Sequence, residues 1–125
     1  MILMLDAHAL LWWLDDDPTL DRAARASIAD PANEVFVSAA TVWELEIKRA
    51  MGKLEAPADL LEVLDAEEFD CLPMLGEDAV HAAALPMHHR DPFDRMLLAQ
   101  ALRLDAVVVS RDLAFAAYDV AVLRA

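Results

Sequence analysis

Short, largely apolar runs alternate along the chain with longer segments in which apolar residues recur at helical spacing. The runs at residues 2–5, 34–37 and 106–109 lack the polar alternation of a half-exposed strand, so they predict strands buried on both faces, as in a parallel sheet. Weaker runs predict a third strand at residues 70–74 and a last edge strand at residues 120–123. Helices are predicted at residues 7–14, 21–30, 39–51, 58–66, 77–85 and 92–103, with a short helix after Ser110.

This order of strands and helices predicts an α/β fold. We expect a three-layer α/β/α domain with a central parallel sheet of four to five short strands. The 125 residues suffice for one domain with a real core, and no repeat, low-complexity segment or Ser/Gly-rich linker divides them. Residues 1–125 are therefore expected to form a single domain.

The clearest helix start lies at Asp91 and Pro92. Asp91 is expected to be the N-cap, whose carboxylate accepts a backbone N–H, and Pro92 suits the first helical position. Asp94 then falls in the first turn, where the positive end of the helix dipole favours a negative charge. The interaction with the helix dipole is enough to explain Asp94 taken alone. A further role for Asp94 depends on which other residues lie near it.

Acidic residues outnumber basic ones by 23 to 10, which gives a formal net charge of −13. This excess argues against a protein that holds nucleic acid through a broad basic face. It suits a protein that concentrates carboxylates, binds cations or pairs with a basic partner. The two glycines of the chain are too few for a Gly-rich dinucleotide loop or a Walker loop.

The single cysteine, Cys71, excludes an internal disulfide and is expected to be a small buried residue. It fits a reducing cytoplasm. The first apolar run has no basic residue before it, and Asp6 and His8 interrupt it too early for a signal peptide or a membrane span. We therefore expect a cytoplasmic protein without a membrane partner.

Four acids are expected to meet at one edge of the sheet. Asp6 and Asp112 each directly follow a predicted strand, whereas Glu44 and Asp94 lie near the starts of predicted helices. In a parallel sheet the carboxyl ends of strands and the amino ends of the following helices share one edge. Two of these acids also have a simpler interpretation. Asp6 could act only as a helix cap, and Glu44 could act only as the surface partner of Lys48 four residues later.

Carboxylates that lie so close together are costly unless a cation neutralises them. Mg²⁺ takes oxygen ligands of this kind, Mn²⁺ fits the same set, and no group of Cys and His has the spacing of a zinc site. The chemistry indicated is hydrolysis of a phosphodiester by a metal-activated water. Four basic side chains could contact the substrate phosphate, or could simply be solvated at the surface. They are Lys48, Arg90, Arg95 and Arg111.

The order of these motifs resembles the PIN-domain family, specifically the VapC-type toxins of type II toxin–antitoxin systems. The resemblance runs nearly end to end. It is carried by residues 5–12 (LDAHALLW), 37–45 (VSAATVWEL), Lys48, 52–54 (GKL), 89–95 (HRDPFDR), 99–101 (AQA) and 109–112 (VSRD). Many relatives have Thr after the first acid, where this chain has Ala7, so one hydroxyl near the metal is missing. Ser110 keeps the hydroxyl that is expected before the last acid.

The resemblance implies that Asp6, Glu44, Asp94 and, more variably, Asp112 form the metal site and the catalytic site. It also implies a Mg²⁺-dependent endoribonuclease toxin that acts on single-stranded RNA. Such a toxin would form a homodimer, join a larger toxin–antitoxin complex and be neutralised by a cognate antitoxin.

Two other classes of function remain to be weighed. A phosphoryl-accepting receiver domain also carries acids at the rim of a parallel sheet, but it needs paired acids after the first strand and a Lys after the last, and this chain has neither. The alternative is a non-catalytic PIN-fold binding module that acts through its antitoxin or dimer surface. Apolar residues at 10–14, with Leu20 and Ile28, are consistent with a groove for an amphipathic antitoxin helix, or with an ordinary core plus a dimer seam.

Overall fold

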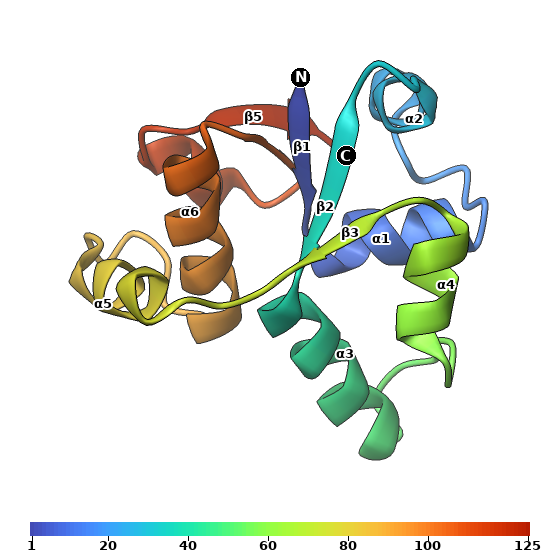
Figure 1. The fold of residues 1–125 in the computed structure, drawn as a ribbon, viewed down its shortest axis with the longest axis horizontal. Helices are drawn as coiled ribbons and strands as arrows, with labels where there is room; N and C mark the ends of the chain where they lie inside the picture. The colour runs from blue at the N-terminus through green and yellow to red at the C-terminus, as the bar shows by residue number, and fades with distance from the viewer.

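Five short parallel strands form one sheet with the strand order β3-β2-β1-β4-β5. The computed structural model describes residues 1–125. The central strand, β1, pairs with β2 on one side (Figure 1), and it pairs with β4 on the other. The strands are β1 (Ile2–Leu5), β2 (Glu34–Ser38), β3 (Asp70–Leu72), β4 (Val107–Ser110) and β5 (Ala121–Arg124).

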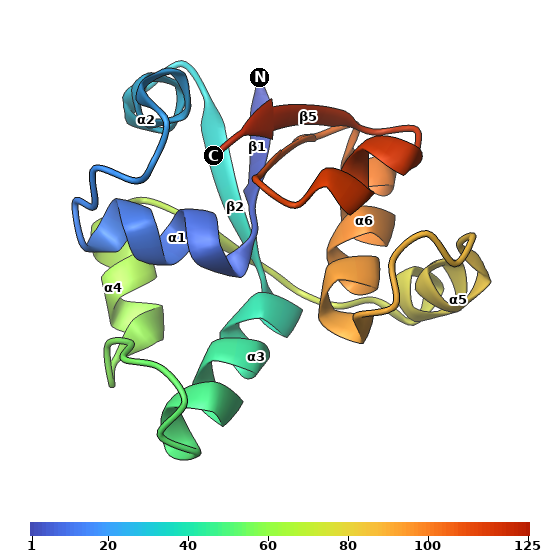
Figure 2. The same cartoon turned by 180° about the vertical axis from the view of Figure 1, so that it is seen from behind.

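Helices cover both faces of this sheet. Helices α1, α2 and α4 lie on one side, and α5 and α6 lie on the other, while α3 extends from the carboxyl end of β2 (Figures 1 and 2). The predicted three-layer α/β/α architecture is confirmed, with five strands. The helices are α1 (Ala7–Leu14), α2 (Arg22–Ala29), α3 (Ala39–Ala50), α4 (Leu60–Ala66), α5 (Gly76–Ala84), α6 (Pro92–Leu104) and the 3₁₀ helix η1 (Leu113–Ala117).

The sheet separates two hydrophobic cores, because successive side chains of a strand point to opposite faces. In β1, Leu3 and Leu5 pack into the core that includes Leu10 of α1. Met4 packs into the other core, which includes Leu98 of α6. All five side chains are fully buried, so β1 is held from both faces and its carboxyl end is a rigid base for whatever follows it.

Two predicted elements differ from the structure by two residues at one end, and the others agree within one residue. The strand predicted at residues 70–74 stops at Leu72, and the helix predicted from residue 58 begins at Leu60 after a turn. The prediction that Cys71 is buried is wrong, because its side chain is exposed. The reason is the position of β3 at the edge of the sheet, where it pairs only with β2.

The residues considered for an antitoxin groove are divided between the core and the surface of α1 and α2. Leu10, Leu20 and Ile28 belong to the buried core beneath α1 and α2, as expected if these residues form an ordinary core. Trp12 and Trp13 of α1 are both half-buried, and the indole N–H of Trp13 donates to Glu67 over 3.1 Å. These apolar side chains therefore hold α1 and α2 on the sheet.

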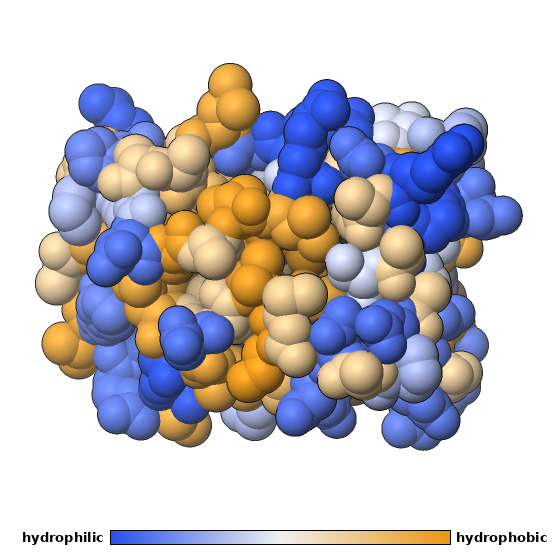
Figure 3. Space-filling model, turned by 90° about the horizontal axis from the view of Figure 1, so that it is seen from above, coloured by the Kyte–Doolittle hydropathy of each residue, from blue (hydrophilic) through white to orange (hydrophobic).

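Several apolar side chains are exposed on the surface of the molecule. Seen from the end of the molecule at which β1 begins, an apolar area lies in the middle of the face with polar side chains around it (Figure 3). A small domain cannot cover its surface with polar atoms alone, so such areas are ordinary. None of the helices is both long enough and apolar enough to cross a lipid bilayer.

Candidate metal centre

All four predicted acids line the same hollow, which has a volume of about 160 Å³. It opens at the carboxyl end of the sheet, where β1 and β4 stop and α1, α3 and α6 begin. The structure thus brings together side chains separated by more than a hundred residues. The lining residues are Asp6, Ala7, His8, Trp12, Glu44, Lys48, Asp91, Asp94, Arg111 and Asp112.

Asp6 is placed by the end of β1 and the start of α1. One carboxylate oxygen, Oδ1, accepts the backbone N–H of Ala9 over 2.9 Å, which caps the helix. The Ser110 side chain at the end of the neighbouring strand β4 favours the ionised form of Asp6 and so lowers the pKa of its carboxyl, against the larger opposite effect of burial. Asp6 therefore caps α1, as the simpler interpretation predicted, and it also lines the hollow.

Glu44 is placed by α3, whose N-cap is Ser38 at the end of β2. Its Oε2 lies 2.8 Å from Nζ of Lys48, so the predicted pair four residues apart is formed. It is not a surface pair, however, because the Glu44 carboxylate is buried. The hydrogen bond to Glu44 raises the pKa of Lys48, so the ammonium stays charged and holds the carboxylate in place.

Asp94 lies in the first turn of α6, and Asp91 caps that helix as predicted. Oδ1 of Asp91 accepts the backbone N–H groups of Phe93 at 2.8 Å and Asp94 at 3.5 Å. The sequence did not place Asp91 in the site, yet it also lines the hollow. Its spacing of three residues from Asp94, one helical turn, was the signal that both would face the same way.

Asp112 completes the set from the loop after β4. Its Oδ1 accepts the backbone N–H of Ala114 over 2.9 Å, which caps η1. Its own backbone N–H donates to Oγ of Ser110 over 3.0 Å. With 43% of its side chain exposed, Asp112 is the least enclosed of the four acids.

Burial and the charges of neighbouring acids make two of the carboxylates, Asp6 and Asp94, hard to ionise without a counter-charge. Burial raises the pKa of Asp6 above its usual range. Burial and then the negative charge of Asp91, with smaller effects of Asp6 and Glu44, raise the pKa of Asp94 to about 7. A divalent cation would remove this penalty, and an all-oxygen donor set suits Mg²⁺ or Mn²⁺.

His89 also belongs to this cluster, although the sequence assigned it no role. Its Nε2 lies 2.8 Å from Oδ2 of Asp112 and 3.0 Å from Oδ2 of Asp94. One ligand atom from each of these three residues lies within 4.8 Å of the others. The only signal in the sequence was the position of His89 in the loop that leads to the capped helix.

The predicted basic residues divide into different roles. Arg95 is not free for a phosphate, because its guanidinium is buried and donates to backbone carbonyls. Arg111 lines the hollow and lies 4.7 Å above the ring of Trp12. Lys48 lines it too, whereas Arg90 is exposed and forms no ion pair.

Comparison with known proteins identifies the family of this chain. A sequence model described as "PIN domain" matches residues 3–121. The chain belongs to the PIN-domain family. PIN domains are generally nucleases and typically use divalent metal ions. No curated protein sequence matches the chain significantly.

Solved structures with the same fold include three whose chains align over nearly their whole length. One is VapBC2 from Rickettsia felis bound to a promoter DNA fragment, with 13% identity, a TM-score of 0.71, and 98% of each chain covered. FitAcB from Neisseria gonorrhoeae has 26% identity and a TM-score of 0.65, with 99% of this PIN domain and 97% of that chain covered. VapBC-5 from Mycobacterium tuberculosis, of the VapBC family of toxin–antitoxin systems, has 22% identity, a TM-score of 0.63 and coverage of 99% and 98%.

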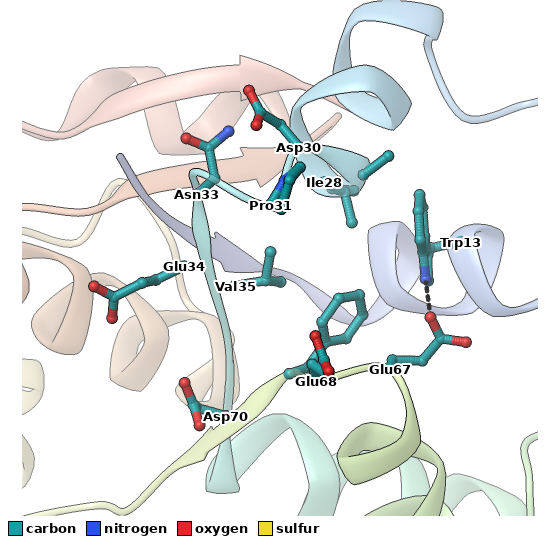
Figure 4. A pocket seen from close by; sticks show the side chains of 12 residues that line it. Trp13, Ile28, Asp30, Pro31, Asn33, Glu34, Val35, Glu67, Glu68 and Asp70 are labelled. Carbon is teal, nitrogen blue, oxygen red and sulfur yellow. Dashed lines mark hydrogen bonds between the residues drawn. The ribbon is translucent and has the colours of Figure 1, made fainter.

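A second hollow of this PIN domain, of about 370 Å³, is a poorer candidate for a metal (Figure 4). It lies where β2 and β3 begin, away from the carboxyl ends of the strands. Its acids are exposed and point in different directions around the rim, and one of them already accepts the indole N–H of Trp13. Solvated carboxylates of this kind need no cation. They are Asp30, Glu34, Glu67, Glu68 and Asp70.

The raised pKa values predict how the metal-free protein responds to pH. Folded Asp6 and Asp94 hold protons more tightly than the unfolded chain, in which the pKa is about 3.8. The free energy of unfolding should therefore fall as the pH rises from about 4 to about 7. Millimolar Mg²⁺ should raise the Tm by about 3–5 °C near pH 8, and by much less near pH 5. Thermal unfolding with EDTA or MgCl₂ measures both effects, and an equal Mg²⁺ shift at the two pH values would contradict them.

Proposed function

We propose that this PIN domain is a Mg²⁺-dependent endoribonuclease, and that it is the toxin of a type II toxin–antitoxin module. The observation that carries the proposal is the meeting of Asp6, Glu44, Asp94 and Asp112 in one hollow. Carboxylates that are both buried and mutually repelling are costly to keep for structure alone. Such a cluster is what a nuclease of this family would need to hold a divalent ion.

The donor set fits the proposed ion. Asp6, Glu44 and Asp94 would hold it through carboxylate oxygens, with Asp112 at the more open side. A bound Mg²⁺ would supply positive charge for the phosphate and increase the acidity of a water molecule; Mn²⁺ would serve in its place. Lys48 keeps Glu44 in place through the 2.8 Å ion pair.

A pair of aromatic rings, of which Trp43 is exposed and Phe93 half-buried, supports single-stranded RNA as the substrate. Trp43 directly precedes Glu44 in α3, and Phe93 directly precedes Asp94 in α6. The two rings form an edge-to-face pair with centroids 5.4 Å apart, and Trp43 is 58% exposed. Unpaired bases stack on exposed aromatic side chains, and this contact accepts any base.

Replacing Trp43 with Ala is therefore expected to raise KM for single-stranded RNA about tenfold, with little change in kcat. The indole is not part of the lining of the acidic hollow, so the chemical step should be spared. Steady-state cleavage of a labelled oligonucleotide separates the two constants. Val80→Ala is the matched control, because Val80 is exposed on α5 away from the site. An unchanged KM in Trp43→Ala would exclude this stacking surface.

The proposed partner is a cognate antitoxin, and the proposed assembly contains a toxin homodimer. Support comes from the motif order and from the similar structures described as VapBC. The net charge of −13 adds a physical reason, because an Arg or Lys of the partner could enter the acidic hollow and displace the ion. Inhibition that weakens when Mg²⁺ is raised would fit this mode of neutralisation.

The test of the proposed function is cleavage of single-stranded RNA by the purified protein, with Mg²⁺ or with EDTA. Asp6→Asn serves as the inactive control, since Asn keeps an oxygen that can cap α1. We expect cleavage only with the metal and the native Asp6. Equal cleavage by Asp6→Asn would remove the assignment. Metal binding without any cleavage would favour a binding module instead, and sequencing of RNA ends after brief induction would name the target.

A further inference from the structure

His89 is held between two of the proposed ligands, which come from different parts of the chain. Asp94 belongs to the first turn of α6, and Asp112 follows β4. The imidazole side chain is 11% exposed and lies edge-on to Phe115, with ring centroids 5.4 Å apart. Its backbone carbonyl accepts from the buried Arg95 over 3.0 Å. Both the ring and the backbone of His89 are therefore fixed.

The other ring nitrogen defines which tautomer is present. The backbone N–H of Asp91 donates to Nδ1 of His89 over 3.2 Å, so Nδ1 carries a lone pair and no proton. The single N–H of the neutral ring must then be on Nε2. That N–H donates to Oδ2 of Asp112 over 2.8 Å, and Oδ2 of Asp94 lies 3.0 Å from the same nitrogen.

This tautomer does not suit a metal ligand. A ligating nitrogen must present a lone pair, and Nε2 has none while it carries the proton. Moving the proton to Nδ1 would set two N–H groups, those of His89 and Asp91, against each other. We propose that His89 is a positioning residue: its Nε2–H holds the Asp112 carboxylate by a hydrogen bond and lies beside the Asp94 carboxylate, so that both acids face one metal position. This inference rests on the proposed metal-dependent function.

A positioning residue is needed because the carboxylates of Asp94 and Asp112 repel each other. Oδ1 of Asp112 is already bonded to the N–H of Ala114, which leaves Oδ2 to face the hollow. Repulsion from Asp94 would turn this half-exposed side chain toward solvent if nothing held it. Groups that hydrogen-bond to metal ligands in this way are worth about 10–100-fold in metal affinity.

Two variants of similar size separate the roles. His89→Gln keeps an N–H donor at the end of the side chain, whereas His89→Leu keeps the packing on Phe115 and loses the donor. We expect His89→Leu to weaken Mn²⁺ binding about 10–100-fold, and His89→Gln to recover most of it. His88→Gln, which alters the neighbouring exposed ring, should leave Mn²⁺ affinity unchanged. In cleavage assays the loss in His89→Leu should be in kcat at limiting metal, with KM for RNA unchanged, and excess metal should restore it.

Two measurements together test whether His89 positions the carboxylates or binds the metal itself. They are isothermal titration with Mn²⁺ and pulsed EPR of the bound ion. The inference expects no directly coordinated nitrogen in the wild-type EPR signal. It is overturned by such a nitrogen signal that disappears in His89→Gln, or by unchanged Mn²⁺ affinity in His89→Leu. If His89→Leu does not fold, as circular dichroism would show, His89→Gln and the EPR signal still decide. A wild-type protein that binds no Mn²⁺ would instead overturn the proposed function, and this inference with it.

Discussion

Asp94→Asn is expected to reduce RNA cleavage by at least about a thousandfold and, at the same time, to stabilise the metal-free protein. Cleavage falls because a carboxylate oxygen of the metal centre becomes a neutral amide oxygen, which binds Mg²⁺ weakly. Stability rises because the Asp94 carboxyl has a pKa raised to about 7, so its charge is unfavourable in the folded state above that pH. The gain should be about 1–2 kcal/mol near pH 8, or about 4–8 °C in Tm.

The control is Asp65→Asn, which removes one negative charge from an exposed position in α4. Both variants change the net charge equally, so any general effect of charge is the same. Cleavage rates with Mg²⁺ and melting curves in EDTA give the two readouts. A drop in the Tm of Asp94→Asn relative to Asp65→Asn would mean that the Asp94 carboxylate is part of the scaffold, not a group held ready for a metal.

Arg95→Met is expected to destabilise the fold by about 3 kcal/mol. The Arg95 guanidinium is 7% exposed and donates to the carbonyls of Ala82, Ala83, Leu85, Pro86 and His89. Helix α5 ends at Ala84, where the last carbonyls have no partner in the helix, and Arg95 from α6 supplies the donors. Met keeps most of the side-chain volume and removes every donor.

Arg90→Met is the matched control, because Arg90 is exposed and has no hydrogen bond or ion pair. Its unfolding free energy should stay within about 0.5 kcal/mol of the wild-type value. Urea unfolding measures both variants. Arg95→Met should also weaken metal binding, since the loop that carries His89 loses its anchor. Equal stability of the two variants would contradict the assignment of Arg95 to the scaffold.

The fold and the placement of the acids were predictable because both follow from local pattern and topology. Unbroken apolar runs such as residues 107–109 belong to buried parallel strands, and every parallel strand ends at the same edge. An acid at or just beyond the end of such a strand, like Asp6 or Asp112, is expected at that edge. Glu44 and Asp94 follow by the same reasoning, from the starts of helices at the edge.

The parts that could not be predicted depend on contacts between segments far apart in the chain. Arg95 looks like any surface cation in the sequence, and only the approach of α5 to α6 shows that it caps a neighbouring helix. The place of His89 in the site depends on a loop conformation that sets its ring between Asp94 and Asp112. Cys71 is exposed because β3 is short and lies at the edge, and its residue type cannot show this.

Anomalous scattering from a crystal soaked in Mn²⁺ is the most direct measurement of whether the four acids form a metal centre. We predict a peak within coordination distance of carboxylate oxygens of Asp6 and Asp94, with Glu44 and Asp112 around it, and with Nε2 of His89 outside that shell. A crystal with no peak in this hollow, or with Mn²⁺ only among exposed acids such as residues 15–17, would contradict the proposed site.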